Sequence, residues 1–147
     1  MFFQPRNFAD GTKEEGYRYL TEFSFEILPS WRYLTSGVEI EKEIVMAQGS
    51  NQIAVNYHMK NRGQEEAVLC VTPFFQFEPK GEDLKEDKIF SRQDQKITDG
   101  KYNLFFETNG ETEEFQEKKE TYFYRYDECD GRRENGTASA VYQIKNG

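Results

Sequence analysis

Hydrophobic and polar residues alternate along much of this chain, which is the pattern of β-strands with one buried face. Residues 17–27 give the clearest example, since from Tyr17 onward most odd-numbered positions are aromatic or aliphatic, while charged residues such as Glu22 lie between them. Residues 52–61 repeat the alternation. We expect both segments to be half-buried strands.

Residues 68–77 differ, because they are apolar at odd and even positions alike. This pattern is typical of a central strand that is covered on both faces. Further along, Asn109 and Gly110 are the strongest short-range signal for a hairpin turn. The segments on either side, 102–107 and 112–116, alternate in character, so we predict that they pair as a β-hairpin.

Two more strands are predicted at residues 122–126 and 138–144, on either side of a polar loop. Residues 81–90 mix charges without an apolar stripe, which predicts a loop or a single turn rather than a helix. About ten short strands separated by turns must bury their apolar faces against one another. The pattern therefore predicts an all-β fold, an antiparallel β-sandwich formed by residues 1–147 as a single domain.

The composition supports a folded domain and narrows the class of partner. Only 36% of the 147 residues are hydrophobic, but 13 Phe, 9 Tyr and 1 Trp bring large apolar areas to a core. The net charge of −8 disfavours nucleic acids, whose phosphates are bound by clustered Lys and Arg. No apolar run approaches the roughly 18 residues of a membrane span, and no signal peptide is recognisable. We expect a cytoplasmic protein that binds neither nucleic acid nor membrane.

Residues with catalytic or metal-binding chemistry form no recognisable motif. Cys70 lies in an apolar segment, where we expect a core residue, and with Cys129 it lacks the spacing of a disulfide framework or zinc site. The only histidine, His58, falls on the polar side of its segment, so no catalytic triad can be assembled. The acidic loop that begins at Asp127 lacks the spacing of a calcium loop. We expect no cofactor, no metal and no catalytic residue.

Two residues have less common surroundings. Lys42 is in phase with apolar Ile40 and Ile44, so strict alternation would turn its ammonium toward the core, where a buried charge is costly. Either a bulge redirects it, or a buried partner receives it, or its stem packs while its head reaches water. Trp31 could be a core residue or a stacking platform for a sugar ring.

Four weak motifs follow one another in order over about half of the chain. Residues 17–23 lead into a series of short segments: Pro29-Ser30-Trp31, Gly37-Val38-Glu39-Ile40-Glu41-Lys42, Val55-Asn56-Tyr57 and Thr72-Pro73-Phe74. In this order the chain resembles the N-terminal module of bacterial and archaeal glycogen debranching enzymes. The resemblance implies a supersandwich, similar to the β-sandwich of galactose mutarotases, which precedes a catalytic (α/α)6 toroid.

The resemblance also limits what this chain is expected to do. The alternating helices of the toroid have no counterpart in the sequence, so the family's amylo-α-1,6-glucosidase acids have none either. The chain resembles part of a larger N-terminal module. In that module an Arg and a His follow the Thr-Pro strand end, but here Phe75-Gln76-Phe77-Glu78 stands in their place.

The resemblance therefore implies a non-catalytic domain of a glycogen debranching enzyme, which packs on a separate (α/α)6 glucosidase domain and shapes its α-glucan cleft. The ligand would be glycogen or a maltooligosaccharide. Planar or hydrogen-bonding side chains suit sugars, and the candidates are Trp31, Tyr33, Phe75, Phe77, Tyr124 and Arg132. An exposed sheet edge could recruit a second copy to form a homodimer. The alternatives are a free-standing carbohydrate-binding or protein-interaction module, and a small all-β enzyme related to the mutarotases.

Overall fold

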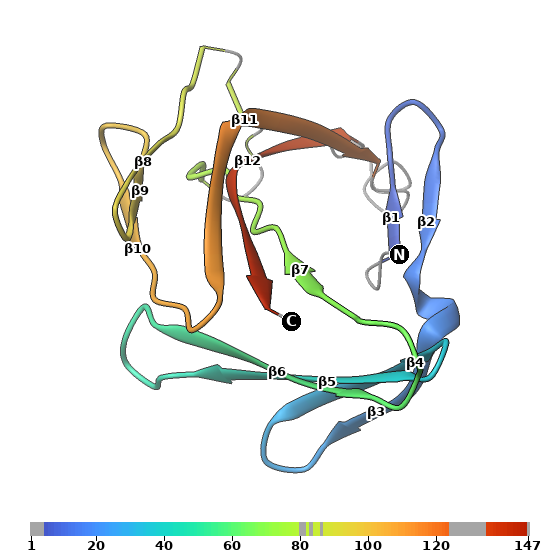
Figure 1. Ribbon diagram of the computed structural model, residues 1–147. Coiled ribbons are helices and arrows are strands. Elements are labelled where there is room, and N and C mark those ends of the chain that lie inside the picture. Colours follow the sequence, from blue (N-terminus) through green and yellow to red (C-terminus); the bar gives the residue numbers. More distant parts are fainter. Residues whose placement is uncertain (1–4, 80–81, 83, 86, 124–134, 147) are drawn as a thin grey trace. The chain divides into compact units, whose positions relative to one another are not determined.

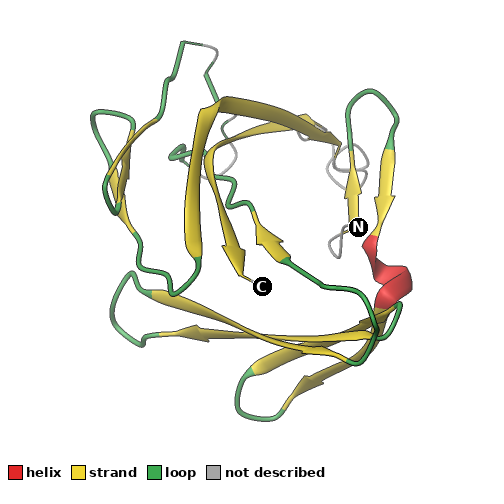
Figure 2. Cartoon of the chain, viewed as in Figure 1, coloured by secondary structure: helices red, strands yellow, loops and turns green. Residues whose placement is uncertain are grey.

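The computed structural model describes residues 5–79, 82, 84–85, 87–123 and 135–146. These residues form twelve strands and one short 3₁₀ helix (Figure 2). The strands lie in four sheets, of which the three larger ones are antiparallel. The predicted all-β fold class is confirmed. Within the described part of the chain, no helix has the length and apolar character needed to cross a membrane.

The chain divides into two compact units. The first unit contains Met1–Arg6 and Glu14–Ala67, and the second contains Asn7–Lys13 and Val68–Gly147. Strands β1 (Pro5–Asn7) and β2 (Lys13–Glu15) form a small two-stranded sheet of their own. Arg6 and Glu14 join the two strands through an ion pair of 2.5 Å.

The first unit is built around a four-stranded sheet in the order β3-β4-β5-β6 (Figure 1). Its strands are β3 (Leu20–Phe25), β4 (Pro29–Thr35), β5 (Val38–Met46) and β6 (Ile53–Asn61). Consecutive strands are joined by short turns, which is why they pair as antiparallel neighbours. At the tightest turn Gly37 has a φ of 82°, a value that glycine adopts without steric cost.

The two faces of this sheet differ in chemistry, because side chains alternate across a strand. In one cross-strand row the polar face carries Glu22, Arg32, Glu41 and His58. In a neighbouring row the opposite face carries Leu20, Tyr33, Ile40 and Met59. We call the second face the apolar face, and its buried centre is formed by Tyr33 and Ile40, which are 8% and 4% exposed.

The predictions for residues 17–27 and 52–61 had different outcomes. Residues 52–61 form β6 as expected, whereas in the first segment Gly16–Tyr19 form the 3₁₀ helix η1 and β3 begins at Leu20. The half-burial predicted for the first segment is wrong, since Phe25 and Ile27 are 69% and 90% exposed. In the second segment it is also wrong for Ile53 and Val55, which are 61% and 45% exposed. Periodicity indicates which side chains share a face, but it does not indicate whether another layer covers that face.

The second unit contains two three-stranded sheets, in the orders β10-β9-β8 and β11-β12-β7. The short strands are β7 (Leu69–Val71), β8 (Ser91–Gln93), β9 (Lys96–Thr98) and β10 (Asn103–Phe105). The long strands are β11 (Glu111–Phe123) and β12 (Asn135–Asn146), which pair with each other.

The hairpin predicted around Asn109 and Gly110 is wrong, because β10 pairs with β9 while β11 pairs with β12. Gly110 lies instead at a close approach of two chain segments. A Cβ atom there would be 2.6 Å from Cγ2 of Ile144 and 2.9 Å from the carbonyl oxygen of Lys145. The glycine is thus required by lack of space.

The central strand predicted at residues 68–77 is reduced to the three residues of β7. Beyond β7, Phe75 makes an isolated bridge with Ser139, in which each backbone N–H donates to the other residue's carbonyl. Cys70 is exposed rather than in the core, which corrects the expectation drawn from its apolar neighbours.

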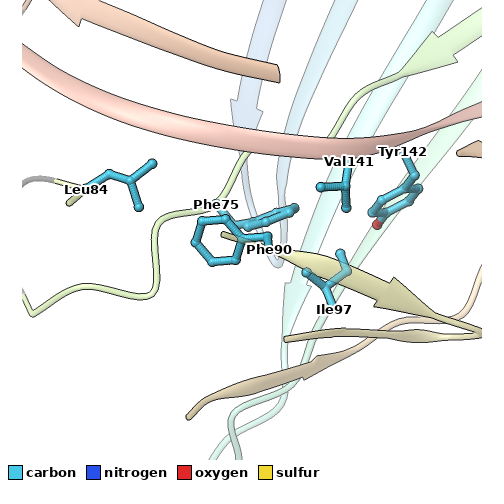
Figure 3. Packing of buried hydrophobic residues seen from close by; sticks show 6 residues of the cluster. All are labelled: Phe75, Leu84, Phe90, Ile97, Val141 and Tyr142. Atoms are coloured by element: carbon cyan, nitrogen blue, oxygen red, sulfur yellow. The ribbon is translucent and has the colours of Figure 1, made fainter. Parts of the chain in front are cut away.

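The core of the second unit is an aromatic and aliphatic cluster (Figure 3). Its buried members are Phe75, Leu84, Phe90, Ile97, Val141 and Tyr142. Phe75 and Phe90 meet edge to face, with ring centroids 4.9 Å apart. Residues from β9, from β12 and from the long connection between β7 and β8 therefore share one interior.

The pairing of β11 with β12 contains a register shift between Glu114 and Lys118. Glu114 pairs with Tyr142 and Lys118 with Ala140, so residues 115–117 face Val141 alone. The fully buried hydroxyl of Ser139 donates a hydrogen bond to the carboxylate of Glu117. The extra residues thus bring a carboxylate to a buried polar group that would otherwise lack a partner.

Candidate functional site

One row of side chains crosses all four strands on the apolar face of the first unit. Strand register places Phe23 opposite Trp31, Trp31 opposite Lys42, and Lys42 opposite Tyr57. We call these four residues the aromatic–lysine row. It brings three aromatic rings and one positive charge together on a surface that is otherwise apolar.

The aromatic–lysine row is exposed to solvent at its β3 end. The ring centroids of Phe23 and Trp31 are 5.3 Å apart, with the two planes tilted by 45°. Phe23 is 56% exposed, whereas Trp31 is partly buried. The ammonium of Lys42 lies 5.3 Å from the centre of the indole ring, within the range of a cation–π interaction.

Burial lowers the pKa of Lys42, because desolvation disfavours its charged form. Within the described part of the chain, no carboxylate or carbonyl lies within bonding distance of its ammonium. Strand β5 pairs with β6 in unbroken register from Val38 to Met46, so no bulge redirects the side chain. Of the three alternatives considered, packing of the stem remains, with the head against Trp31.

Two phenol groups add hydrogen-bonding hydroxyls to this otherwise apolar face. Burial raises the pKa of Tyr57, and the nearby Tyr33 raises it further. Burial also raises the pKa of Tyr33. Both hydroxyls are therefore neutral near pH 7, when they can donate and accept hydrogen bonds.

His58 lies on the polar face of the same sheet, as its position in the alternation predicts. Its Nε2 is 4.0 Å from a carboxylate oxygen of Glu43, and its side chain is 66% exposed. The interpretation of His58 as a surface residue is confirmed. A solvated imidazole with one distant carboxylate has no nucleophile or second base to act upon.

The second unit contains a buried ion cluster centred on Lys88. Its ammonium donates hydrogen bonds of 2.8 Å to the carbonyl of Phe77 and to Glu78, and it lies 3.0 Å from Asp99. The side chains of Lys88, Glu78 and Asp99 are only 14%, 5% and 3% exposed. The cluster ties the connection between β7 and β8 to the end of β9.

Hydrogen bonding controls the ionisation of this cluster. Burial alone would raise the pKa of Asp99, but hydrogen bonds from the backbone of Tyr102 and Lys101 and from Lys88 lower it to about 2. The hydrogen bond from Lys88 lowers the pKa of Glu78. Burial opposes the charge on Lys88, but its two carboxylate partners outweigh this and raise its pKa. All three groups are held in their charged forms, which suits a structural role better than proton transfer.

Two shallow hollows lie on the second unit. One is lined by Phe8, Ala9, Asp10, Thr12, Glu120 and Thr121, and the other by Thr72, Glu113, Phe115, Lys118, Gln143 and Lys145. In the second hollow Gln143 donates a hydrogen bond of 2.8 Å to Thr72, and Lys145 pairs with Glu113. Its main polar groups are thus already satisfied. No group of three potential metal-binding side chains occurs among the described residues.

The structure brings together some of the predicted sugar contacts and not others. Trp31 and Tyr33 occupy alternate positions of β4 and share the apolar face. Phe75 and Phe77 are stacked on each other at 5.7 Å, and both pack edge-on against Phe90 in the core of the second unit. The remaining candidates, Tyr124 and Arg132, lie outside the described residues.

Sequence reasoning missed Phe23 and Tyr57 as members of this site. Both lie at apolar positions of segments that were predicted to be strands. What was lacking is the cross-strand register, which aligns them with Trp31 and Lys42. The sequence did offer one signal, the position of Lys42. A lysine among apolar positions is unusual, and the residues paired with it across the strands form the site.

Comparisons with known proteins give one extensive match and one short one. A family model described as glycogen debranching enzyme N terminal matches residues 4–143. The membrane protein insertase YidC of Thiobacillus denitrificans is 35% identical to this chain over 60 residues. That similarity covers 41% of this chain, and this chain spans 11% of that curated relative. No solved structure matches.

Proposed function

Since this chain belongs to the glycogen debranching enzyme N-terminal family, we propose that it acts as a non-catalytic domain of such an enzyme. In this role it packs on a separate α-1,6-glucosidase domain and helps to shape the cleft that holds an α-glucan. The enzyme would work on glycogen or maltooligosaccharides in the cytoplasm. Family membership is the observation that carries the proposal.

The apolar face of the four-stranded sheet supports packing on another domain. Large side chains on this face are strongly exposed: Phe23, Phe25, Met46, Ile53 and Val55 are 56%, 69%, 76%, 61% and 45% exposed. Contiguous apolar patches of this kind are rare on soluble monomers and mark interaction surfaces. A second domain seated over Phe25, Met46, Ile53 and Val55 would remove these side chains from water and leave the row of Phe23 and Trp31 beside it.

The charged groups support a non-catalytic role for the chain itself. Glycoside hydrolysis uses one carboxylic acid with a raised pKa and one carboxylate. In the buried cluster the pKa values of Glu78 and Asp99 are both lowered, so neither carboxyl is suited to donate a proton. In our proposal the reaction takes place in the partner domain.

We place the proposed sugar contact at Trp31, with the exposed Phe23 beside it in the same cross-strand row, and Tyr33, although buried, remains a proposed contact. The C–H face of a pyranose can stack on an indole ring, and phenol hydroxyls can bond to sugar hydroxyls. Phe75 is buried in the core of the second unit and Phe77 is partly buried against it, and both remain proposed contacts. Tyr124 and Arg132 remain proposed contacts.

Two measurements test the proposal. Isothermal titration of the chain with maltoheptaose should give binding that is lost in Trp31→Ala and kept in Phe105→Ala. Phe105 is a suitable control, because it is 74% exposed and belongs to β10 of the second unit. The chain should also co-purify with the glucosidase domain of the debranching enzyme from the same organism.

The outcomes separate the candidate functions. Sugar binding without association would support a free-standing carbohydrate-binding module, whereas association without sugar binding would leave only the packing role. If neither is observed, the proposed function is wrong and family membership alone stands.

A further inference from the structure

We propose that β6 is an edge through which two copies of this chain join, strand to strand, so that their two four-stranded sheets become one continuous sheet. The proposal concerns the first unit alone and does not depend on a role in debranching. It is carried by the regularity of β6, by its unpaired outer edge and by the way its sequence complements itself.

Strand β6 presents a long, regular and unpaired edge. It is the last strand in the order β3-β4-β5-β6. Its nine residues, Ile53–Asn61, pair with β5 without a bulge, and none of them is proline. Among the described strands only β5 pairs with it. Proteins usually protect such edges with prolines, bulges, charges or short strands, because unpaired N–H and C=O groups recruit further strands.

The other described edges of the larger sheets are short or interrupted. Strand β3 has six residues, and its pairing shifts register between Leu20 and Glu22. Strands β7, β8 and β10 have three residues each. Strand β11 is long, but its register shifts between Glu114 and Lys118, and Tyr122 is bridged by Phe8. Strand β6 alone combines length with an uninterrupted register.

An antiparallel pair of β6 strands overlaps fully when the two-fold axis passes through Tyr57, the middle residue of Ile53–Asn61. On the apolar face this register sets Val55 of one copy opposite Met59 of the other. On the polar face it sets Asn56 opposite His58 and Ala54 opposite Lys60. Pairs that lie directly opposite each other determine how well two strands match.

This register brings no like charges together. Lys60 carries the only permanent charge in β6, and it faces the methyl group of Ala54 from the second copy. Val55, 45% exposed in the single chain, gains a direct apolar neighbour. The apolar face continues across the junction, so the side chains that form it extend over both copies.

The charge on Lys60 provides a matched pair of tests at Ala54. In Ala54→Lys the new ammonium would face Lys60 of the second copy, and symmetry makes this contact twice. In Ala54→Glu the new carboxylate would face the same lysine and form an ion pair, again twice. Within one chain Ala54 is exposed and lies opposite uncharged Val45, so we expect both substitutions to leave the fold intact.

Sedimentation equilibrium over a wide concentration range gives the readout. The unsubstituted chain should approach twice its mass of 17.4 kDa. Ala54→Lys should weaken the dimer about tenfold, and Ala54→Glu should strengthen it or leave it unchanged. Added salt should reduce the difference between the two variants, since it screens exposed charges. Circular dichroism of each variant checks that the strands have formed.

Three results would overturn the proposal. The chain could remain monomeric up to millimolar concentration, in which case β6 does not recruit a second copy. A dimer that neither substitution affects would use another surface. If both substitutions weakened the dimer equally, the register centred on Tyr57 would be wrong.

Discussion

The ammonium of Lys42 lies 5.3 Å from the centre of the Trp31 ring, directly across the pair of strands β4 and β5. A cation in this position is stabilised by the negative face of the indole. It still loses part of its hydration, which is why burial lowers its pKa. The pair therefore places a costly charge in the centre of the surface that we propose for packing and sugar contact.

Replacing Lys42 with methionine should stabilise the chain. The substitution keeps the length of the stem and removes the desolvated ammonium, at the loss of a cation–π contact of about 0.5–1 kcal/mol. We expect the melting temperature to rise by a few degrees, as measured by circular dichroism. Lys60→Met on the exposed polar face is the control and should leave it unchanged. A fall in the Lys42 variant alone would show that the ammonium has a stabilising partner.

Replacing Lys88 with methionine should have the opposite effect. It would leave Glu78 and Asp99 as neighbouring buried carboxylates without their shared cation. Removing the shared cation should therefore lower the free energy of unfolding. Urea denaturation should show this loss, while Lys101→Met on the exposed loop should stay within about 0.5 kcal/mol of the unsubstituted chain. Equal stability of the two variants would contradict the structural role of the cluster.

The stability of the chain should fall in acid as Asp99 of the same cluster becomes protonated. Its pKa is about 2 in the folded chain, against an ordinary value of 3.8, so the folded state binds the proton more weakly than the unfolded state. Its contribution to stability is therefore complete above about pH 4 and is lost as the pH falls toward 2. Asp99→Asn lacks this contribution at every pH. Melting curves from pH 2 to 6 should show the two proteins differing most at pH 6 and converging at pH 2.

A substitution at Gly110 tests whether lack of space for a side chain, rather than turn geometry, requires glycine at this position. An added Cβ would meet Ile144 and the backbone of Lys145 at 2.6 and 2.9 Å. Gly110→Ala should therefore destabilise the chain by about 1–3 kcal/mol through overpacking. Its neighbour Asn109 is exposed, and Asn109→Ala should change stability by less than about 0.5 kcal/mol. If Asn109 proved the more sensitive position, a hairpin-type turn would be the better explanation.

Local pattern was sufficient where a strand pairs with its neighbour in sequence. It predicted β6 and β12 and placed Lys42 on the apolar face. It failed at Asn109 and Gly110, where β10 pairs with the preceding strand β9 and β11 pairs with the following strand β12. Which of its two sequence neighbours a strand pairs with depends on the whole sheet, and a short segment does not show it.

The candidate site shows the same contrast between features that local spacing predicts and features that depend on the rest of the fold. Trp31 and Tyr33 have the same aromatic-x-aromatic spacing as Phe75 and Phe77. The first pair lies on one face of a four-stranded sheet. In the second pair Phe75 is buried in the core of the other unit, and Phe77 is partly buried against that core. Spacing predicts that each pair shares a face, but only the surrounding layers decide how far each ring is buried.

The register shift in β11 determines how the length of this domain can change among relatives. The chain takes four steps from Glu114 to Lys118 in β11 but only two between their partners, Tyr142 and Ala140. Because side chains alternate with a period of two, this even surplus leaves both halves of the hairpin in phase. Insertions and deletions at this point should therefore accumulate in pairs during evolution. A single-residue change would exchange the inner and outer faces of one half of the strand, unless a one-residue bulge like that between Leu20 and Glu22 absorbed it.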